Sequence, residues 1–82
     1  MYELDWISRR SYIRIVADNI RSVLTERKIS QREAARLCGL STSTLNSILT
    51  YKTLPSLKTG LAIAQGLGVT MNELYNTWYM VD

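Results

Sequence analysis

The chain has 82 residues, of which 46% are hydrophobic, and it carries a formal net charge of +3 at pH 7. A chain of this length buries about two-thirds of the surface of its unfolded state, which supplies one core and not two. No apolar stretch approaches the roughly 20 residues of a membrane span, and the first residues lack the apolar segment of a signal peptide. We therefore expect a single soluble, cytoplasmic domain over residues 1–82, with its core at about 9–76, an N-terminal extension at 1–8 and an apolar tail at 77–82.

The residue types limit catalytic and metal chemistry. The chain has no histidine and only one cysteine, Cys38, so the common zinc sites and the histidine-dependent catalytic triads cannot form. We expect no metal, no cofactor and no enzymatic activity. Carboxylate-only catalysis stays open, because the sequence cannot place two of the scattered acids together. Cys38 is predicted to be a small buried apolar residue in a reducing compartment.

The basic residues are concentrated in the middle of the chain. Residues 9–58 contain all ten lysines and arginines but only three acids, a net charge of +7, whereas the two ends together carry −4. Clustered cations bind phosphates favourably because binding releases counterions. The distribution favours a polyanionic partner; the alternative is a charged face that meets only solvent.

Two helices are predicted in the first half of the chain. Apolar residues recur every three to four positions over 9–27, which predicts an amphipathic helix. Ser30 followed by Glu33 predicts a capping box, in which the hydroxyl accepts from the Glu33 N–H and the carboxylate returns to the cap N–H. A second helix is expected over 31–38, ending at a left-handed Gly39. Its predicted buried residues are Ala34, Leu37 and Cys38.

Three shorter helices are predicted in the second half. Ser41 is a typical N-cap and starts a third helix that runs to about Thr50. The pattern breaks before Pro55, and Ser56 opens a fourth helix that ends at Gly68. Its predicted core side carries Leu57, Leu61, Ala64 and Leu67, and close packing must compensate the helix-weakening Gly60 and Gly66.

The fifth helix begins at a second predicted capping box, formed by Thr70 and Glu73. It carries the apolar residues Met71, Leu74, Tyr75 and Trp78. No strand pattern or internal repeat appears, so the sequence predicts an all-α fold with five helices.

The third helix has an unusual polar side. At 100° per residue, Leu45, Ile48 and Leu49 share one side of the helix. The other side carries Thr42, Ser43, Asn46, Ser47 and Thr50. A solvated helix face more often carries Glu, Lys, Gln or Arg, which are better helix formers. This side is therefore predicted to make close contacts; the alternative is a polar surface that happens to lack charge.

Five residues follow one another at spacings of four, four, six and three: Gln31, Ala35, Gly39, Leu45 and Ile48. With these residues, over about residues 20–75, the chain resembles the phage-repressor-type, Cro-like (xenobiotic-response-element) helix-turn-helix DNA-binding domains of bacteria and their mobile elements. The resemblance implies a lambda-repressor-like fold whose second and third helices form the helix-turn-helix. Ala35 must be small where these two helices cross, Gly39 supplies the positive φ of the turn, and Leu45 and Ile48 lock the third helix.

The resemblance also implies how the chain meets double-stranded DNA. The third helix would enter the major groove, with its N-terminal residues facing base edges. The implied base-reading residues are Ser41, Thr42, Ser43, Asn46 and Ser47. The implied phosphate-binding residues are Gln31, Thr44, Tyr51, Lys52, Thr53 and Arg21.

The chain departs from the family pattern in three places. Leu24 stands where an arginine is frequent, and Tyr51 stands where a glycine is usual after the third helix. The third helix also lacks the Gln and Arg often found on its outward face. Asn46 is therefore the one residue there able to make a two-pronged base contact, best suited to adenine.

The expected function is sequence-specific DNA binding by a transcriptional regulator, a repressor acting at its operator. The sequence does not distinguish a phage or plasmid repressor, a restriction-modification controller and an antitoxin. The alternative is a protein-interaction module on the same scaffold, such as an antitoxin binding a toxin.

A homodimer on a palindromic operator is expected, because one short helix reads few bases. Its expected interface is Met71, Tyr75, Trp78 and Tyr79, which form an apolar C-terminal surface. The alternative is that Trp78 and Tyr79 fold back on the first helix, beside Trp6 and Tyr12.

Overall fold

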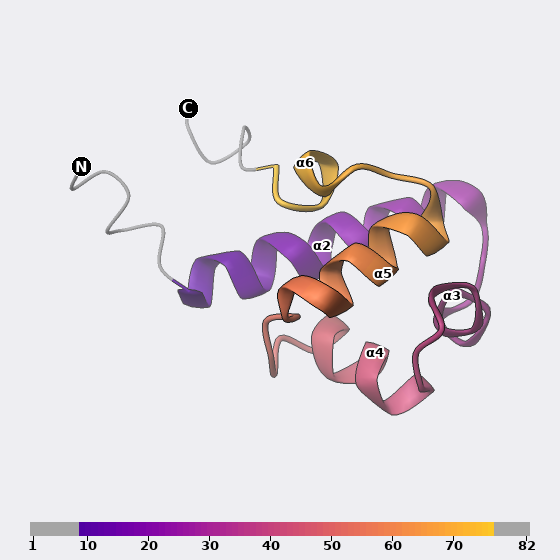
Figure 1. The fold of residues 1–82 in the computed structure, drawn as a ribbon, viewed down its shortest axis with the longest axis horizontal. Helices are drawn as coiled ribbons and strands as arrows, with labels where there is room; N and C mark the ends of the chain where they lie inside the picture. Colours follow the sequence, from indigo (N-terminus) through magenta and orange to yellow (C-terminus); the bar gives the residue numbers. More distant parts are fainter. Residues whose placement is uncertain (1–8, 77–82) are drawn as a thin grey trace.

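The computed structural model describes residues 9–76. Its helices, in chain order, are α2 (Arg9–Arg27), α3 (Gln31–Cys38), α4 (Thr42–Leu49), α5 (Leu57–Leu67) and α6 (Met71–Leu74). No strand occurs between residues 9 and 76, so the prediction of an all-α fold with five helices is confirmed. In Figure 1, α3 and α4 lie on one side of α5, and α6 lies on the other. No helix within the described range has the length and apolarity needed to span a membrane.

Hydroxyl side chains set the starts of the four shorter helices. In each case the cap residue has an extended backbone, and its side-chain oxygen accepts a hydrogen bond from the N–H three residues later. The caps are Ser30, Ser41, Ser56 and Thr70. The capping box predicted at Thr70 is confirmed, because Glu73 Oε1 accepts from the Thr70 N–H at 2.7 Å. Gly39 and Gly68 end α3 and α5 with φ of 69° and 70°, in the left-handed region that glycine enters without strain.

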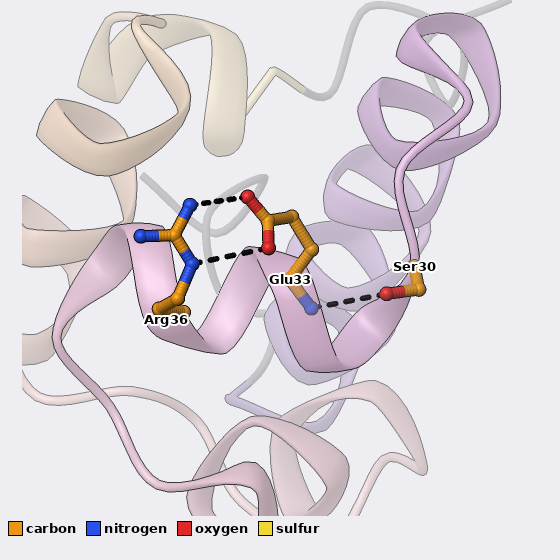
Figure 2. Close-up of polar contacts among 3 residues, drawn as sticks. All are labelled: Ser30, Glu33 and Arg36. Carbon is orange, nitrogen blue, oxygen red and sulfur yellow. Dashed lines mark hydrogen bonds and ion pairs between the residues drawn. The ribbon is translucent and has the colours of Figure 1, made fainter.

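The capping box predicted at Ser30 is wrong in one half. Ser30 Oγ accepts from the Glu33 N–H at 3.0 Å, as expected. The Glu33 carboxylate, however, turns to Arg36, whose Nε and Nη2 donate to its two oxygens (Figure 2). The hydrogen bond from Arg36 lowers the pKa of Glu33. Both arrangements would be charge-assisted, but Arg36 offers a donor to each carboxylate oxygen, whereas the cap offers a single N–H.

One hydrophobic core joins all five helices. It is built from Val16, Ile20 and Leu24 of α2, Ala34, Ala35 and Cys38 of α3, Leu45, Ile48 and Leu49 of α4, Ile63, Ala64 and Leu67 of α5, and Leu74 of α6. The prediction that Cys38 is a small buried residue is confirmed, and burial raises the pKa of its thiol.

The predicted core side of α5 is partly wrong. Leu57 is 70% exposed and Leu61 is 42% exposed, although Ala64 and Leu67 are buried as predicted. The buried side of α5 consists of Gly60, Ile63, Ala64 and Leu67. Because apolar residues surround this helix on nearly every side, periodicity alone does not select the buried one. Gly60 and Gly66 mark the packed sides of α5, since a neighbouring segment approaches the helix closely at each of them.

The packing at the two glycines of α5 compensates their low helix propensity, as predicted. A Cβ at Gly66 would lie 2.7 Å from both the Cα of Cys38 and the carbonyl oxygen of Leu37, so α3 rests directly on the backbone of α5. Gly60 faces the side chains of Met71 and Tyr75. Leu37 itself is 42% exposed, and the prediction that it is buried is wrong. Ala34, Ala35 and Cys38 occupy the inner side of α3 instead.

Three polar side chains of α2 bind the carboxyl ends of other helices. Arg21 Nη2 donates to the carbonyl of Leu49 in α4, and Arg27 Nη1 donates to that of Leu67 in α5. Asn19 Nδ2 donates to the carbonyl of Leu74 in α6 at 2.7 Å. Donors and cations are favourable there, because the last carbonyls of a helix lack partners and carry partial negative charge.

The fifth helix is shorter than predicted. α6 ends at Leu74, where Asn19 takes the terminal carbonyl, and Tyr75 is its C-cap. Trp78, which was expected to continue the helix, lies outside the described residues.

Candidate nucleic-acid interface

The turn between α3 and α4 fixes the angle between these two helices. The N–H of Leu40 donates to the carbonyl of Ala35 at 2.9 Å, and Gly39 has the positive φ that this turn needs. Ala35 is 2% exposed, which places a methyl group where a longer side chain would hold the helices apart. Leu45 and Ile48 are each 1% exposed and anchor α4 on the core. The outward side of α4 is therefore held rigidly by the opposite, apolar side.

The side of α4 opposite its anchoring residues is polar, exposed and uncharged. Thr42, Ser43, Asn46 and Thr50 are exposed, and Ser47 is half-buried. This outward face of α4 contains no acidic or basic residue in its first or last turn. It offers short side chains that can both donate and accept hydrogen bonds, which is what contact with base edges requires.

Some of the hydroxyls near this face are already engaged. Ser41 Oγ accepts from the N–H of Thr44 at 3.1 Å and donates to its Oγ1 at 2.8 Å, so the two side chains close the start of α4. Thr50 Oγ1 donates to the carbonyl of Asn46 at 2.7 Å and closes its end. The side chains of Thr42, Ser43 and Ser47 make no hydrogen bond within residues 9–76 and remain available to a ligand.

Gln31 and Asn46 connect α3 to the outward face of α4. Gln31 Nε2 donates to Asn46 Oδ1 at 3.1 Å. Gln31 is the first residue of α3 and is half-buried, whereas Asn46 is exposed. The structure thus brings together a predicted phosphate-binding residue and the central predicted base-reading residue.

The carboxyl end of α4 is held against α2 by a second group of side chains. Tyr51 Oη donates to Asp18 Oδ1 at 2.6 Å, and the guanidinium carbon of Arg14 lies 4.8 Å from the centre of the Tyr51 ring. The hydrogen bond with Asp18 raises the pKa of Tyr51. Tyr51 and Arg21 were both expected to bind phosphate. Here Tyr51 binds Asp18 and Arg21 binds the carbonyl of Leu49, so each has a partner within the protein.

The loop after Tyr51 presents two further predicted phosphate-binding residues. Lys52 and Thr53 are exposed. The N–H of Lys52 donates to the carbonyl of Ser47 at 2.9 Å, which ties the start of the loop to α4. The ammonium group of Lys52 has no ion-pair partner among residues 9–76, so its charge is available to an anion next to α4.

Of the predicted dimer residues, Met71 and Tyr75 fall within the described part of the chain. Met71 and Tyr75 are half-buried and pack against the core, with the Tyr75 ring centroid 6.1 Å from that of Tyr12. Burial raises the pKa of Tyr75. Trp78 and Tyr79 lie outside the described residues, as does Trp6.

Sequence analysis missed the roles of Arg14, Asp18 and Asn19. Asp18 and Tyr51 are 33 positions apart, and Asn19 and Leu74 are 55 apart, so no local pattern links either pair. The available signal was Tyr51 itself, a bulky residue at a position where left-handed backbone is expected. Such a residue needs tertiary contacts to hold it there.

α3, the turn at Gly39 and α4 together form a helix-turn-helix. The helix-turn-helix family model HTH_3 matches residues 20–74, and the chain belongs to that family.

Two crystal structures are similar to this fold. An HTH_3 family transcriptional regulator from Vibrio cholerae has a TM-score of 0.81 at 21% sequence identity, covering 90% of this chain and 42% of that chain. A hypothetical transcription factor, NHTF, from Neisseria has a TM-score of 0.75 at 25% identity, covering 83% of this chain and 78% of that chain. The present chain thus spans less than half the length of the Vibrio protein. No curated protein sequence matches it.

Proposed function

We propose that the chain is a sequence-specific DNA-binding transcriptional regulator that acts as a repressor at an operator. The observation that carries the proposal is the outward face of α4, which is exposed and hydrogen-bonding while Leu45, Ile48 and Leu49 are each 1% exposed behind it. Membership of a helix-turn-helix family supports it, as do two similar structures described as a transcriptional regulator and a transcription factor. A regulator of this kind works in the cytoplasm, where the DNA is.

In the proposed complex, α4 lies in the major groove. Thr42, Ser43, Asn46 and Ser47 face base edges, with Ser41 at the margin. The N-terminus of α3, with Gln31, approaches a phosphate, which the positive end of the helix dipole favours. Further phosphate contacts come from Thr44, Lys52, Thr53 and the guanidinium N–H groups of Arg21 that do not bind Leu49. Tyr51 adds a contact only if its hydroxyl exchanges Asp18 for a phosphate. These contacts position the protein, while the outward face of α4 selects the sequence.

In this proposal, the protein represses transcription by occupying promoter DNA. A domain bound in the major groove of a promoter competes with RNA polymerase for the same DNA. The test is a gel shift with DNA that flanks the chain's own gene, run at two salt concentrations with unrelated DNA as control. A specific shifted band supports the proposal, and equal affinity for both DNAs contradicts it.

We propose a two-fold homodimer on palindromic half-sites, with Met71, Tyr75, Trp78 and Tyr79 at its interface. Deleting residues 77–82 should weaken self-association in analytical ultracentrifugation while the helical circular dichroism signal persists. Unchanged self-association would contradict this interface.

A protein-interaction module is the second candidate. The observation that favours it is the exposure of Leu57 and Leu61, which offer apolar surface to a protein partner such as a toxin. The gel shift of the wild-type chain discriminates between the two candidates, and replacing both leucines with serine checks that they take no part in DNA binding. Retained operator binding by this variant supports the DNA-binding regulator, whereas a chain that binds only a protein partner would show no specific gel shift before or after the change.

A further inference from the structure

Arg14 of α2 is an exposed cation whose N–H groups have no hydrogen-bond or ion-pair partner within residues 9–76. Its guanidinium carbon lies over the Tyr51 ring, 4.8 Å from the ring centre. A guanidinium that rests on an aromatic face keeps the N–H groups at its edge free to donate, and the contact limits its motion. Arg14 was not among the phosphate-binding residues expected from the sequence. It is therefore an oriented donor that the interface described above does not use.

Tyr51 keeps Arg14 apart from the nearest acid on its own helix. Asp18 follows Arg14 by four positions, a spacing at which opposite charges pair on the surface of a helix. That pair does not form here. Tyr51 Oη donates to Asp18 Oδ1 at 2.6 Å, and the ring of the same residue lies against Arg14. Tyr51 thus occupies both side chains, and the charge of Arg14 stays available to an external anion.

Arg14 lies beside the end of α4, where the proposed interface continues into the loop. Arg21 comes seven positions after Arg14, on the same side of α2, and it binds the carbonyl of Leu49, the last residue of α4. Tyr51 and the exposed Lys52 follow α4 in the chain. The side of α2 that carries Arg14 therefore faces the end of α4, and the Tyr51 ring brings Arg14 next to the loop that carries Lys52.

We propose that Arg14 binds a phosphate of the DNA backbone other than the one bound by Lys52, with Tyr51 as the positioning residue that presents it. This inference rests on the DNA binding proposed above, and it extends the contact beyond the helix-turn-helix to the first half of α2. A glycine, usual at position 51 in the family pattern, has no ring, so the arrangement depends on a departure of this chain from that pattern. The contact adds affinity without base selectivity.

The salt dependence of operator binding tests whether Arg14 neutralises a phosphate. Arg14→Gln should make the log–log slope less steep by about one unit and leave the order of preferred sequences unchanged. Arg14→Lys is the matched control, since it keeps the charge and should keep the slope. Position 14 is exposed, so both variants should melt like the wild type in circular dichroism. A slope in Arg14→Gln equal to that of the wild type overturns the inference.

Ethylation interference separates the phosphate of Arg14 from that of Lys52. Operator DNA with randomly ethylated phosphates is divided into bound and free fractions, and the positions at which ethylation prevents binding are read from each. Arg14→Gln should abolish interference at a phosphate where Lys52→Gln leaves it intact. If both variants lose the same phosphate, Arg14 acts only by supporting the loop, and the inference is overturned while the proposed function stands.

The role of Tyr51 is tested by a variant that removes no charge. Tyr51→Gly removes the ring and accepts the positive φ, so Arg14 becomes free to pair with Asp18, and the slope should again be less steep by about one unit. Adding Asp18→Asn to Tyr51→Gly should restore the slope, which it would not do if the change had merely displaced Lys52. An unchanged slope in Tyr51→Gly overturns the positioning role of Tyr51. If the wild-type chain binds no operator DNA, the proposed function fails, and the inference fails with it.

Discussion

Tyr51 shows how a single residue holds the end of α4. Its φ is 65°, a left-handed conformation that side chains other than glycine enter at a cost. The contacts that hold it there come from α2: Asp18 accepts from its hydroxyl at 2.6 Å, and Arg14 lies over its ring. Arg21, also from α2, binds the carbonyl of Leu49, the last residue of α4, which lies shortly before Tyr51 in the sequence. The departure from the usual glycine is thus compensated by tertiary contacts.

Two substitutions at Tyr51 separate backbone strain from side-chain contacts. Both Tyr51→Gly and Tyr51→Ala remove the ring and the hydroxyl, and they differ only in the cost of the positive φ. We expect Tyr51→Gly to be more stable than Tyr51→Ala by about 1 kcal/mol, because alanine pays the left-handed penalty. Urea unfolding of the two variants measures the difference. Equal stability, or a more stable Tyr51→Ala, would show that this backbone conformation is not strained.

At the scale of the helices, two glycines of α5 allow neighbouring segments to pack closely against it. A Cβ at Gly66 would meet backbone atoms of α3, the Cα of Cys38 and the carbonyl oxygen of Leu37, each at 2.7 Å. A Cβ at Gly60 would lie 3.2 Å from the hydroxyl of Tyr75, the far end of a side chain that can shift. The two positions therefore differ in how far their neighbours can yield.

We expect the same substitution to have different effects at these two positions. Gly66→Ala should destabilise the protein by about 1–3 kcal/mol, because two helices must separate to admit the methyl group. Gly60→Ala should change stability by less than about 1 kcal/mol, because its gain in helix propensity offsets a small shift of Tyr75. Thermal unfolding followed by circular dichroism measures both. Similar losses in the two variants would contradict the close contact between α3 and α5.

The elements that could be predicted from the sequence are those that depend on nearby residues. The N-cap hydroxyls and Gly39 act within one turn, so their roles are visible in the sequence. The outward side of α4 is predictable for the same reason, because Leu45, Ile48 and Leu49 define the buried side. The predicted buried face of α5 was wrong at Leu57 and Leu61, because apolar residues lie on several sides of this helix and their spacing alone does not identify the buried one.

Contacts between distant residues could not be predicted. Gln31 and Asn46 are 15 positions apart, and Arg21 and Leu49 are 28 apart. Neither distance corresponds to a helix period, and each pair meets only because the core sets the angles between helices. The site was therefore predicted as a set of residues, and their mutual contacts came from the structure.

For the whole molecule, the main electrostatic feature is the basic middle of the chain. Two of its three acids, Asp18 and Glu33, are bound by Tyr51 and Arg36. Lys52 is exposed on the loop that follows α4, and it is one of the proposed phosphate-binding residues. This arrangement supports the proposed binding to a polyanion, in which α4 would supply the selectivity.

We expect operator affinity to fall steeply with salt, with a log–log slope of about −4 to −8. Lys52→Gln should make this slope less steep by about one unit, because one fewer phosphate is neutralised, and it should leave the order of preferred sequences unchanged. Fluorescence anisotropy titrations at several salt concentrations measure the slope. A slope that is the same with and without Lys52 would remove this residue from the interface.

The most direct test of the base-reading role of α4 is the operator affinity of Asn46→Ala, measured beside its affinity for unrelated DNA. Asn46 is exposed, and its hydrogen bond from Gln31 is exposed too, so the melting temperature should change little, as surface substitutions cost within about 0.5 kcal/mol. Leu45→Ala is the control on the buried side of the same helix, and it should lose about 2–5 kcal/mol of stability. Specific binding by Asn46→Ala should weaken by about 1–3 kcal/mol, with binding to unrelated DNA nearly unchanged. Operator binding equal to that of the wild type would contradict the account, because the outward face of α4 would then be polar without reading bases.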